Sequence, residues 1–500
     1  MAHVTATARL RGADAGAARE DSDRPRLGEF GILLGGESTS TGETFAVHSP
    51  YDGGLVATVH RAGPSHIEQA IAKAAGAFQV TRRLPSWKRA LVLETVSASI
   101  AARRDELAVG IALEAGKPIR TARAEVERAV FTFKVAAEET KRIQGEIVAL
   151  DWLPGLDGRE AHVRRVPLGP VAGITPFNFP INLVAHKVAP ALAAGNPVII
   201  RPATQTPVSA LLLGRLVVDA GWPADAMAVV PSTTANAAPL VADERMKLLS
   251  FTGSPAVGWS LKPKAGRKRV TLELGGNAAI IVHADAEVEY AAERVAWGGF
   301  SYAGQSCISA QRIYVHDAIY DRFRDELLRR VQALKTGDPL DEATDVGPVI
   351  DSVAADRIGE WLEEARRAGA AVLTGGTREG NLWTPTIVEH APANVRVNCQ
   401  EVFAPLVTLQ RYSDIDDAIR AAGASDFGLQ AGIFTHDERV IAKAVDEIEV
   451  GGLMVNDVAT FRVDHMPYGG VKLSGFGREG LRYAIEEMTE LKLVTFNRNH

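Results

Sequence analysis

The chain has 500 residues, of which 46% are hydrophobic and 23% are charged, and its net charge is −6. That length allows two or three domains with a sizeable core, and the composition is ordinary for a soluble globular protein. The acidic balance argues against nucleic acid as the main partner, because phosphate binding needs a basic surface. No apolar run approaches the roughly 20 residues of a membrane helix, so we expect no membrane association.

The N-terminal segment and the cysteine content bear on where the protein is found. Residues 1–27 are rich in Ala, Arg and Asp without an apolar centre, so they lack the pattern of a secretory signal and are predicted to be a disordered extension. Two cysteines are too few for a disulfide framework and, by themselves, for a metal site. We therefore expect a reducing, cytoplasmic setting and no bound metal.

Strands and helices alternate from Val171 onward. The first predicted strand, 171–175, is followed by the loop "PFNFP" and a helix at 181–195, with Pro180 near its first turn and Gly195 at its end. We predict further strands at 197–202, 226–231 and 248–253 and a helix at 206–221. Strands that alternate with helices of this length form right-handed βαβ units and a parallel sheet.

A second alternating series begins after Glu273. We predict strands at 278–282, 370–376, 429–435 and 451–456 and helices at 317–335 and 352–369. This series is interpreted as a second α/β domain.

Two segments lie outside the alternation. Residues 145–169 contain two strand-like runs around a Gly-rich turn and are predicted to form a hairpin, and residues 490–497 have the pattern of a single strand. A strand without a partner in its own domain exposes unpaired backbone groups. We therefore expect this strand to pair with the hairpin of another subunit, giving a homodimer or a homotetramer.

Cys307 stands in "GQSCIS", just before a strand-like run at 311–315. A lone cysteine is more often a small buried hydrophobe than a nucleophile. A nucleophile requires a thiolate, a place for the negative charge that it creates, and a base for the second half of the reaction. The other cysteine, Cys399, has no glycine or basic neighbour, and we interpret it as structural.

Two polar residues at strand ends could be the partners of such a nucleophile. Asn178 lies in the loop after a parallel strand, where open α/β sheets bind ligands, and its amide could donate to an oxyanion together with the N–H of Cys307. The alternative for Asn178 is an Asx turn. Glu273 ends a strand before "LGGN" and could act as a general base, although a solvated turn residue is the commoner case.

Two further stretches suggest a nucleotide. In "SFTGSPAVGWS" (250–260), Gly253 and Ser254 precede a helix, and a helix N-terminus after a parallel strand suits a pyrophosphate. The glycine spacing matches neither the dinucleotide-binding fingerprint nor a Walker loop, so this signal is weak. Glu401 in "CQEVFAPL" could bind a ribose hydroxyl.

Together the motifs resemble those of the aldehyde dehydrogenase superfamily, over nearly all the chain from about residue 28. The matching stretches occur in the order "PFNFP", "KVAPALAAGNPVIIRPATQTPVSAL", "FTGS", "LELGGN", "GQSCIS", "EVFAPL" and "PYGGVKLSGFGREG". The resemblance implies an α/β fold with two parallel-sheet, Rossmann-like domains and a small β oligomerisation element. It implies a cofactor-binding domain at 28–144 and 169–275, a catalytic domain at 276–468, and an oligomerisation element at 145–168 and 483–497.

The resemblance also implies roles for individual residues. Cys307 becomes the nucleophile, Glu273 the base and Asn178 the oxyanion donor, and Lys187 becomes a proton relay, its alternative being a helix-surface charge. The cofactor is NAD or NADP, with Glu401 on the nicotinamide ribose. The cofactor contacts implied are Thr175, Pro176, Phe177, Arg201, Thr204, Gly253, Ser254, Val257, Glu401 and Phe403.

This assignment implies the reaction. The Cys307 thiol attacks an aldehyde, the adduct expels hydride to the nicotinamide and leaves a thioester, and Glu273 activates the water that releases a carboxylic acid. Gly304 is expected to leave room for cofactor and substrate around the sulfur.

Three alternatives remain for the function. The first is a related enzyme that passes its thioester to coenzyme A, but the acylating branch lacks the base that Glu273 supplies. The second is a non-catalytic binding protein on the same fold, which would be expected to lose Cys307 or Glu273. The third is a cysteine hydrolase, disfavoured because no histidine lies near Cys307 in the sequence.

The chain departs from the family's pattern at several positions. "RPAT" has Thr204 where relatives often carry a glutamate that repels the 2′-phosphate of NADP, and Arg201 keeps a cation on the same loop. Asn277 stands where Lys is frequent, which we treat as neutral. Ser306 precedes the nucleophile where relatives acting on phosphorylated aldehydes can carry arginine, which makes a glyceraldehyde phosphate less suitable.

The expected substrate is a short polar or anionic aldehyde, as in the lactaldehyde and phosphonoacetaldehyde dehydrogenase-like branch. In the resemblance the helix after "PFNFP" lines the substrate tunnel, and Asn182 and His186, four residues apart, share one face of it. The predicted substrate contacts are Phe179, Asn182, His186, Ser306, Arg462 and His465, with Arg128 as a further candidate. The alternative is that these are surface charges paired with Asp457, Asp464 or Glu127.

Overall fold

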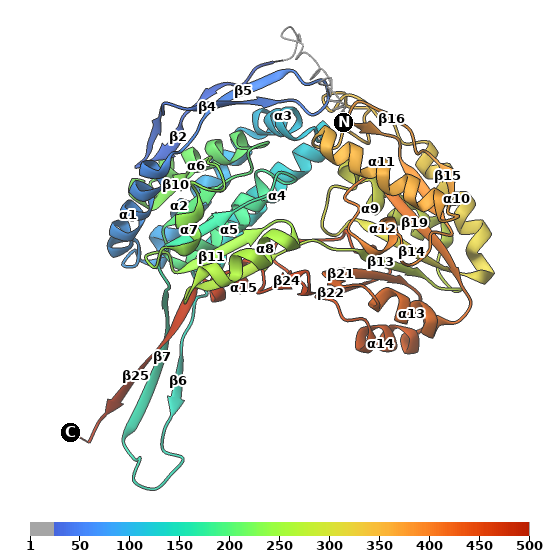
Figure 1. Cartoon of the computed structure of the whole chain (residues 1–500). Coiled ribbons are helices and arrows are strands. Elements are labelled where there is room, and N and C mark those ends of the chain that lie inside the picture. Colours follow the sequence, from blue (N-terminus) through green and yellow to red (C-terminus); the bar gives the residue numbers. More distant parts are fainter. Residues whose placement is uncertain (1–24, 500) are drawn as a thin grey trace, which may run out of the picture.

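The structure is a computed structural model that describes residues 25–499 (Figure 1). The predicted disordered extension, residues 1–27, lies outside the described residues except for positions 25–27. The chain forms two lobes, each built on a sheet, and a thin arm that projects from one of them (Figure 1).

The first lobe contains an eight-stranded sheet with a parallel centre. The central strands, in spatial order, are β12 (Arg269–Glu273), β11 (Leu248–Thr252), β8 (Val171–Ile174), β9 (Val198–Arg201) and β10 (Met227–Val229). Antiparallel strands close both edges: β24 (Gly475–Phe476) beside β12, and β2 (Ile32–Leu34) with β3 (Glu37–Thr39) beside β10. The predicted strands of this region are confirmed to within two residues.

Helix α5 (Asn182–Ala194) connects β8 to β9 and lies in the centre of this lobe. All its residues are buried, as expected for a helix that is apolar around most of its circumference. The helix ends at Gly195, whose φ of 87° is a left-handed conformation that glycine adopts without strain. The predicted helix at 206–221 is α6 (Val208–Asp219).

Buried carboxylates from neighbouring helices cap α5 and α6. Glu125 of α4 (Ile119–Thr140) accepts hydrogen bonds from the backbone N–H groups of Ile181 and Asn182, at 3.1 and 3.2 Å. Glu114 of α3 (Arg104–Ala115) does the same for α6, and burial raises its pKa to about 7. A carboxylate at a helix N-terminus satisfies free N–H groups and interacts favourably with the helix dipole, so these two residues fix where α5 and α6 begin.

The remaining elements of the first lobe surround this centre. They are α1 (Pro64–Thr81), α2 (Ser86–Ala102), α7 (Ala238–Ala242), α8 (Pro255–Leu261), α15 (Leu481–Glu487), and a small sheet of β1 (Gly28–Phe30), β5 (Leu55–His60) and β4 (Thr44–His48).

The second lobe contains a seven-stranded sheet. Its strands, in spatial order, are β15 (Ala371–Thr374), β18 (Thr386–Glu389), β19 (Leu406–Tyr412), β14 (Ala310–His316), β13 (Ala278–Val282), β21 (Gln430–Phe434) and β22 (Gly452–Val455), and only β15 is antiparallel to its neighbour. Its helices include α9 (Val288–Phe300), α10 (Tyr320–Gln332), α11 (Ser352–Arg367), α13 (Ile415–Gly423) and α14 (Glu438–Glu447). The predicted elements are present, and the sequence analysis missed β18 and β19.

The arm is a three-stranded antiparallel sheet of β25 (Thr489–Asn497), β7 (Arg159–Pro167) and β6 (Glu146–Ala149) (Figure 1). The predicted hairpin and the predicted C-terminal strand are both present, but they pair within one chain, from Thr489 opposite Pro167 to Asn497 opposite Arg159. The expectation that this pairing joins two subunits is therefore wrong. Within residues 25–499, the backbone groups on one edge of β25 pair with β7, and no strand pairs with its other edge.

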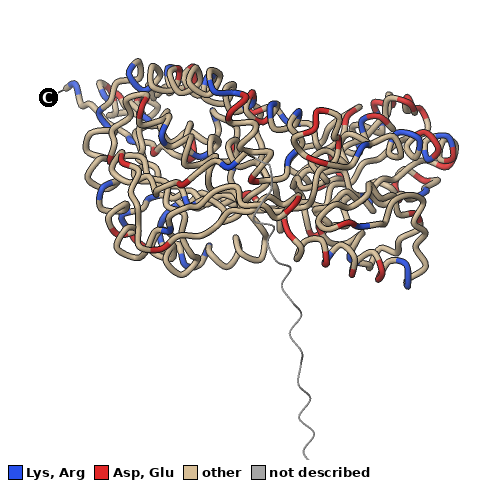
Figure 2. The backbone as a smooth tube through the Cα atoms, turned by 90° about the horizontal axis from the view of Figure 1, so that it is seen from above, with Lys and Arg blue, Asp and Glu red and all other residues tan. Residues whose placement is uncertain are grey.

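Acidic and basic residues occur together in both lobes (Figure 2). Within residues 25–499, no helix is both long enough and apolar enough to cross a membrane.

Candidate active site

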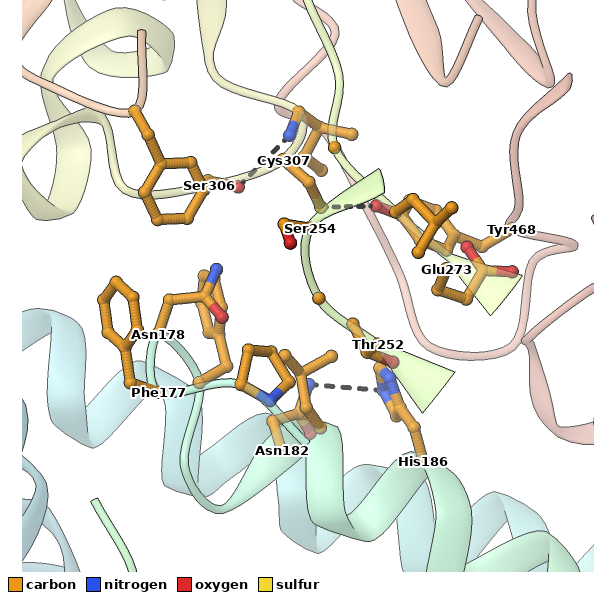
Figure 3. Close-up of a pocket in the computed structure, with 18 of the residues that line it drawn as sticks. Phe177, Asn178, Asn182, His186, Thr252, Ser254, Glu273, Ser306, Cys307 and Tyr468 are labelled. Carbon is orange, nitrogen blue, oxygen red and sulfur yellow. Dashed lines mark hydrogen bonds between the residues drawn. The ribbon is translucent and has the colours of Figure 1, made fainter. Parts of the chain in front are cut away.

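A cavity of about 230 Å³ lies where the carboxyl ends of β8, β11 and β12 meet the loop that precedes β14 (Figure 3). Asn178 enters it from the loop after β8, Ser254 from the segment after β11, Glu273 from the end of β12, and Cys307 from the second lobe. The ends of parallel strands are the usual ligand-binding edge of an α/β sheet. The fold therefore brings together residues that lie far apart in the sequence.

Cys307 follows a strained turn. Tyr302, Ala303 and Gly304 all have positive φ angles, of 50°, 53° and 67°. A Cβ atom on Gly304 would lie 2.0 Å from the carbonyl oxygen of Ala404. The expectation that Gly304 leaves room for ligands is therefore wrong, because this glycine is required by the turn and by close backbone packing.

Gly276 allows its own backbone to lie close to the backbone of Cys307. A Cβ atom on Gly276 would lie 2.2 Å from the carbonyl oxygen of Cys307, so only glycine fits beside the cysteine backbone. The turn and this contact together hold Cys307 against the end of the neighbouring "LELGGN" segment.

The Cys307 side chain is half-buried, and its Sγ lies 2.9 Å from the hydroxyl oxygen of Tyr468. Desolvation raises the pKa of the thiol to about 12, and the Tyr468 contact acts in the opposite direction. The backbone N–H of Cys307 donates no hydrogen bond within residues 25–499. The residue therefore presents a sulfur and a free N–H donor at one place.

Asn178 is 4% exposed and lines the same cavity. Its Nδ2 donates one hydrogen bond, 3.0 Å long, to the carbonyl oxygen of Gln305, which leaves its second N–H for a ligand. Because this bond links the Asn178 loop to the residue two before Cys307, it sets the amide beside the nucleophile.

A buried ion pair that the sequence analysis missed holds the Asn178 loop. Lys117 is fully buried, pairs with Glu125, and donates to the carbonyl oxygen of Asn178 at 2.8 Å. Its ammonium lies 3.7 Å from the centre of the Phe179 ring, a cation–π contact. Burial lowers the pKa of Lys117 to about 8. The available signal was the presence of charged residues in the apolar stretch "VGIALEAGKPI".

Glu273 is 4% exposed, and neither carboxylate oxygen has a hydrogen-bond partner within the described residues. Burial, and then the nearby Glu479 carboxylate, raise its pKa well above the usual range. An unpaired carboxylate with a raised pKa, on a residue that lines the cavity, has the properties of a general base.

Lys187 does not line the cavity, nor is it a surface charge. It is fully buried, and its Nζ donates to Ser250 at 3.0 Å and Thr252 at 2.7 Å and lies 3.6 Å from Glu479. Burial lowers its pKa. Its predicted position near the active site is observed, one residue layer behind the wall that Thr252 forms.

A buried charge network forms the far end of the cavity. His186 contacts the carboxylates of Asp464 at 2.8 Å and Glu479 at 3.1 Å. Arg128 binds Asp464 at 2.7 Å, and Arg462 binds Glu479 at 2.8 Å. Although burial opposes ionisation, His186 holds the pKa values of both carboxylates well below their usual range, with help from the neighbouring cations.

Most predicted substrate contacts border this cavity, and one does not. The lining includes Phe179, Asn182, His186, Ser306, Arg462 and Arg128. His465 is exposed, packs edge-on against Phe131, and is not among the lining residues. The pairing of Arg128 with Asp464 was foreseen as the alternative interpretation, but the pair is largely buried rather than superficial.

The predicted cofactor contacts fall into two groups. Pro176, Phe177, Gly253, Ser254, Glu401 and Phe403 line the cavity. Thr175, Arg201, Thr204 and Val257 lie outside it: the backbone N–H of Thr175 donates to the carbonyl of Arg201, Thr204 is exposed, and Val257 of α8 is 45% exposed. Glu401 and Phe403 precede β19 of the second lobe, and the other residues lie at or just after the carboxyl ends of the neighbouring strands β11, β8 and β9. A row of contacts along one sheet edge suits an extended ligand such as a dinucleotide.

Glu401 is the acidic residue of the group that lines the cavity. Its Oε1 accepts from the backbone N–H of Gly276 at 2.9 Å, and its Oε2 has no hydrogen bond within residues 25–499. Burial raises its pKa to about 7. The free oxygen on the cavity wall fits an acceptor for ribose hydroxyl groups.

The family model described as "Aldehyde dehydrogenase family" matches residues 37–494. The 3-sulfolactaldehyde dehydrogenase of Priestia aryabhattai is 45% identical over 470 residues, which cover 94% of this chain and 98% of the relative. Aldehyde dehydrogenase 21 from Physcomitrella patens, solved with the reaction product succinate, has a TM-score of 0.93 and 40% identity and covers 95% of this chain and 99% of its own. The glyceraldehyde-3-phosphate dehydrogenase GapN from Methanocaldococcus jannaschii, solved with NADP, has a TM-score of 0.88 and 36% identity. The match covers 91% of this chain and 100% of the GapN chain.

With a fold, a cavity and motifs of this kind, the chain belongs to the aldehyde dehydrogenase family. It is an enzyme that oxidises an aldehyde to its acid with NAD or NADP. The predicted family, fold class and cofactor type are confirmed, and the acid-forming reaction is favoured over the coenzyme A alternative and the non-catalytic alternative.

Proposed function

We propose that this enzyme oxidises a short aldehyde that carries an anionic group, a sulfonate, carboxylate or phosphonate, at the end remote from the carbonyl. The observation that carries the proposal is the pair of guanidinium groups, Arg128 and Arg462, on the wall of a small and mostly buried cavity. The cavity volume of about 230 Å³ suits a short substrate.

The hydrogen bonds of the two arginines leave donors for a ligand. Arg128 uses Nε and Nη2 to bind Asp464, and its Nη1 has no hydrogen bond within the described chain. Arg462 uses Nη2 for Glu479, and its Nε is buried without a partner. Buried donors without acceptors cost free energy, which a ligand anion would recover.

The net charge of the buried charge network also supports an anionic substrate. The network's fixed cations are Arg128 and Arg462, which pair with the carboxylates of Asp464 and Glu479, and Lys187 adds a positive charge when it is protonated. With Lys187 protonated and with His186 and Glu273 neutral, the cations exceed the anions by one, and a substrate anion would balance the surplus in a place that water screens poorly. The sulfonate in the name 3-sulfolactaldehyde and the second carboxylate of succinate are groups of this kind, in similar proteins.

The same geometry supports the catalytic roles. The Cys307 thiolate attacks the carbonyl carbon, and the resulting alkoxide receives hydrogen bonds from Asn178 Nδ2 and from the free N–H of Cys307 (Figure 3). Glu401 and Phe403 would hold the nicotinamide end of the cofactor at this cavity, and the bound cofactor would supply the acceptor for the hydride that the adduct loses. Glu273 then takes a proton from water, which attacks the Cys307 thioester and releases the acid. The thiol has to stay reduced throughout, which supports a cytoplasmic location.

Lys187 is proposed to relay protons behind Glu273. It lies between Thr252 and Glu479 in a fully buried position, and the Glu273 carboxylate acts on its pKa through space. Burial lowers the pKa of Lys187, so this lysine gives up its proton more readily than an exposed one.

Glu273→Gln is expected to separate the two halves of the reaction. The variant should produce one burst of reduced cofactor and then stall at the thioester, because an amide cannot accept the proton of water. In the wild type, the thioester hydrolysis rate should rise with pH through a midpoint well above 4.5, since Glu273 has to be ionised and its pKa is raised. Rapid-mixing absorbance measurements over pH would show both effects, and steady turnover of the variant at the wild-type rate would contradict the role.

Arg128→Gln is expected to act on anionic substrates alone. For an anionic aldehyde such as succinic semialdehyde, kcat/KM should fall about tenfold or more, the effect of losing a charge-assisted hydrogen bond of about 1.5–3 kcal/mol. For a neutral aldehyde of similar length, butanal, it should change less than about twofold.

A matched control lies on the same helix. Arg123 also belongs to α4 but pairs with Asp105 and Glu342 away from the cavity, so Arg123→Gln should change neither substrate. An equal fall for both aldehydes in the Arg128 variant, or hexanal as the best substrate of the wild type, would contradict an anion site.

The residues expected near the adenosine ribose of the cofactor do not exclude either NAD or NADP. We infer that the enzyme accepts NADP. Thr204 is exposed and neutral, so it cannot repel a 2′-phosphate, and Arg201 stands at the end of β9 on the same loop. We assign the cofactor to the first lobe, near residues 28–144 and 169–275, and the nucleophile to the second, near 276–468, as the sequence analysis proposed.

Thr204→Glu is expected to select against NADP. A carboxylate about 4 Å from a phosphate costs about 1–4 kcal/mol at surface-like dielectric, which corresponds to a rise in KM for NADP of one to three decades. Steady-state kinetics with both cofactors would measure it, with KM for NAD as the internal control. Equal NADP kinetics in wild type and variant would refute the inference.

The arm is proposed to bind a second copy of the chain. Its outer strands β6 and β25 have free edges, and large apolar side chains on the arm are exposed: Ile147 69%, Trp152 86%, Leu153 66%, Leu491 57% and Leu493 60%. Exposed strand edges with apolar side chains are surfaces on which another chain can pair.

Light scattering is therefore expected to give a dimer or a tetramer of the 53.4 kDa chain. Leu493→Glu should lower the mass towards that of one chain, because it places a charge on the proposed contact. A wild-type monomer at micromolar concentration would disprove the assembly.

A further inference from the structure

Among residues 25–499, Tyr468 is the one side chain that forms a hydrogen bond with the nucleophilic sulfur, and no step of the proposed mechanism uses it. Its hydroxyl oxygen lies 2.9 Å from Cys307 Sγ, and the side chain lines the cavity. In Figure 3 the dashed line joins these two groups on the side of Glu273, whereas Asn178 lies on the other side of the cysteine. The hydroxyl makes no other hydrogen bond within residues 25–499.

The tyrosine is held rigidly in this position. It is 3% exposed, and its backbone N–H and C=O pair with those of Glu479, at 3.0 and 2.6 Å. The guanidinium carbon of Arg462 lies 3.5 Å from the centre of its ring, a close cation–π contact. Burial raises the pKa of the Tyr468 hydroxyl well above its usual range, so the group keeps its proton and can donate it in a hydrogen bond, while the Arg462 cation acts on that pKa in the opposite direction.

Apart from Tyr468 and the Arg462 cation, the surroundings disfavour a negative sulfur. Burial raises the pKa of the Cys307 thiol, and the carboxyl groups of Glu401 and Glu273 in the same cavity act in the same direction. A thiol is a weak hydrogen-bond donor, whereas a thiolate accepts a charge-assisted bond that is about twice as strong as a neutral one. A fixed O–H donor at 2.9 Å therefore stabilises the thiolate more than the thiol.

We propose that the Tyr468 hydroxyl donates its hydrogen to the Cys307 thiolate and thereby sets the fraction of enzyme that can attack the aldehyde. Tyr468 keeps its own proton, and the proton that Cys307 loses passes to solvent water. Once the sulfur has bonded to carbon it is a poor acceptor, so the contribution ends with the attack and does not extend to thioester hydrolysis. This proposal rests on the nucleophilic role assigned to Cys307.

The test measures the thiol directly rather than turnover. Tyr468→Phe removes only the hydroxyl and keeps the ring against Arg462. In a Cys399→Ser background, so that a single thiol is read, the alkylation rate of Cys307 by iodoacetamide is followed over pH. A one-unit rise in the thiol pKa would leave tenfold less thiolate, but a more basic thiolate is also about threefold more nucleophilic. The rising limb of the profile should therefore move to higher pH by about half a unit, with alkylation at pH 7 about threefold slower or more.

A matched control is Tyr320→Phe, which also removes a buried tyrosine hydroxyl, here bonded to Glu389 in the second lobe, and neither residue lines the cavity that holds Cys307. Its alkylation profile should follow that of the wild type. The rate of thioester hydrolysis in single turnovers should be unchanged by Tyr468→Phe. An unchanged alkylation profile in Tyr468→Phe, or an equal shift in Tyr320→Phe, would overturn the proposal.

Separate experiments test the role of Cys307 and the role of Tyr468. Aldehyde oxidation that survives in Cys307→Ala would remove the nucleophile and the proposed function with it. The alkylation profile needs no substrate, so a missing shift in Tyr468→Phe would overturn the tyrosine's role alone and leave the proposed function standing.

Discussion

The Lys117–Glu125 ion pair is fully buried, and the geometry of the site depends on it. One carboxylate oxygen of Glu125 receives the first N–H groups of α5, and the Lys117 ammonium holds the carbonyl of Asn178. The oxyanion donor and the helix that carries His186 and Lys187 are thus anchored to the same two charges. Replacing one partner would leave the other charge buried and unpaired, which would lower the free energy of unfolding by about 3–5 kcal/mol.

Burial is also the common cause of the electrostatics in the cavity. It raises the pKa values of Cys307, Glu273 and Glu401 together, so all three groups favour their neutral forms. A raised pKa helps Glu273, which has to receive a proton, but it hinders Cys307, which has to lose one. In a dry cavity, the thiolate of Cys307 has to be stabilised by nearby hydrogen-bond donors and cations. Tyr468, which contacts the sulfur, and Arg462, which packs against the Tyr468 ring, are groups of this kind.

The sequence predicted the residues whose role follows from a strand end. Asn178 and Glu273 follow strands of one parallel sheet, so their meeting at its edge could be expected from the topology. Cys307 precedes a strand of the other sheet, and its place beside them followed only from the resemblance to the family. Lys117 and Tyr468 could not be found in this way, since their contacts with Asn178 and Cys307 span 61 and 161 residues. The role of Gly304 was misjudged for the same reason, because its neighbour Ala404 is distant in the sequence.

The order of strands in the arm has a consequence for biosynthesis. Arg165 of β7 bonds to Thr489 of β25, 324 residues later, and the whole seven-stranded sheet is made between these two strands. A ribosome therefore exposes the β6–β7 hairpin long before the strand that completes it. Until β25 is synthesised, β7 presents an open edge on a nascent chain, and neighbouring chains on one messenger RNA would meet with that edge uncovered.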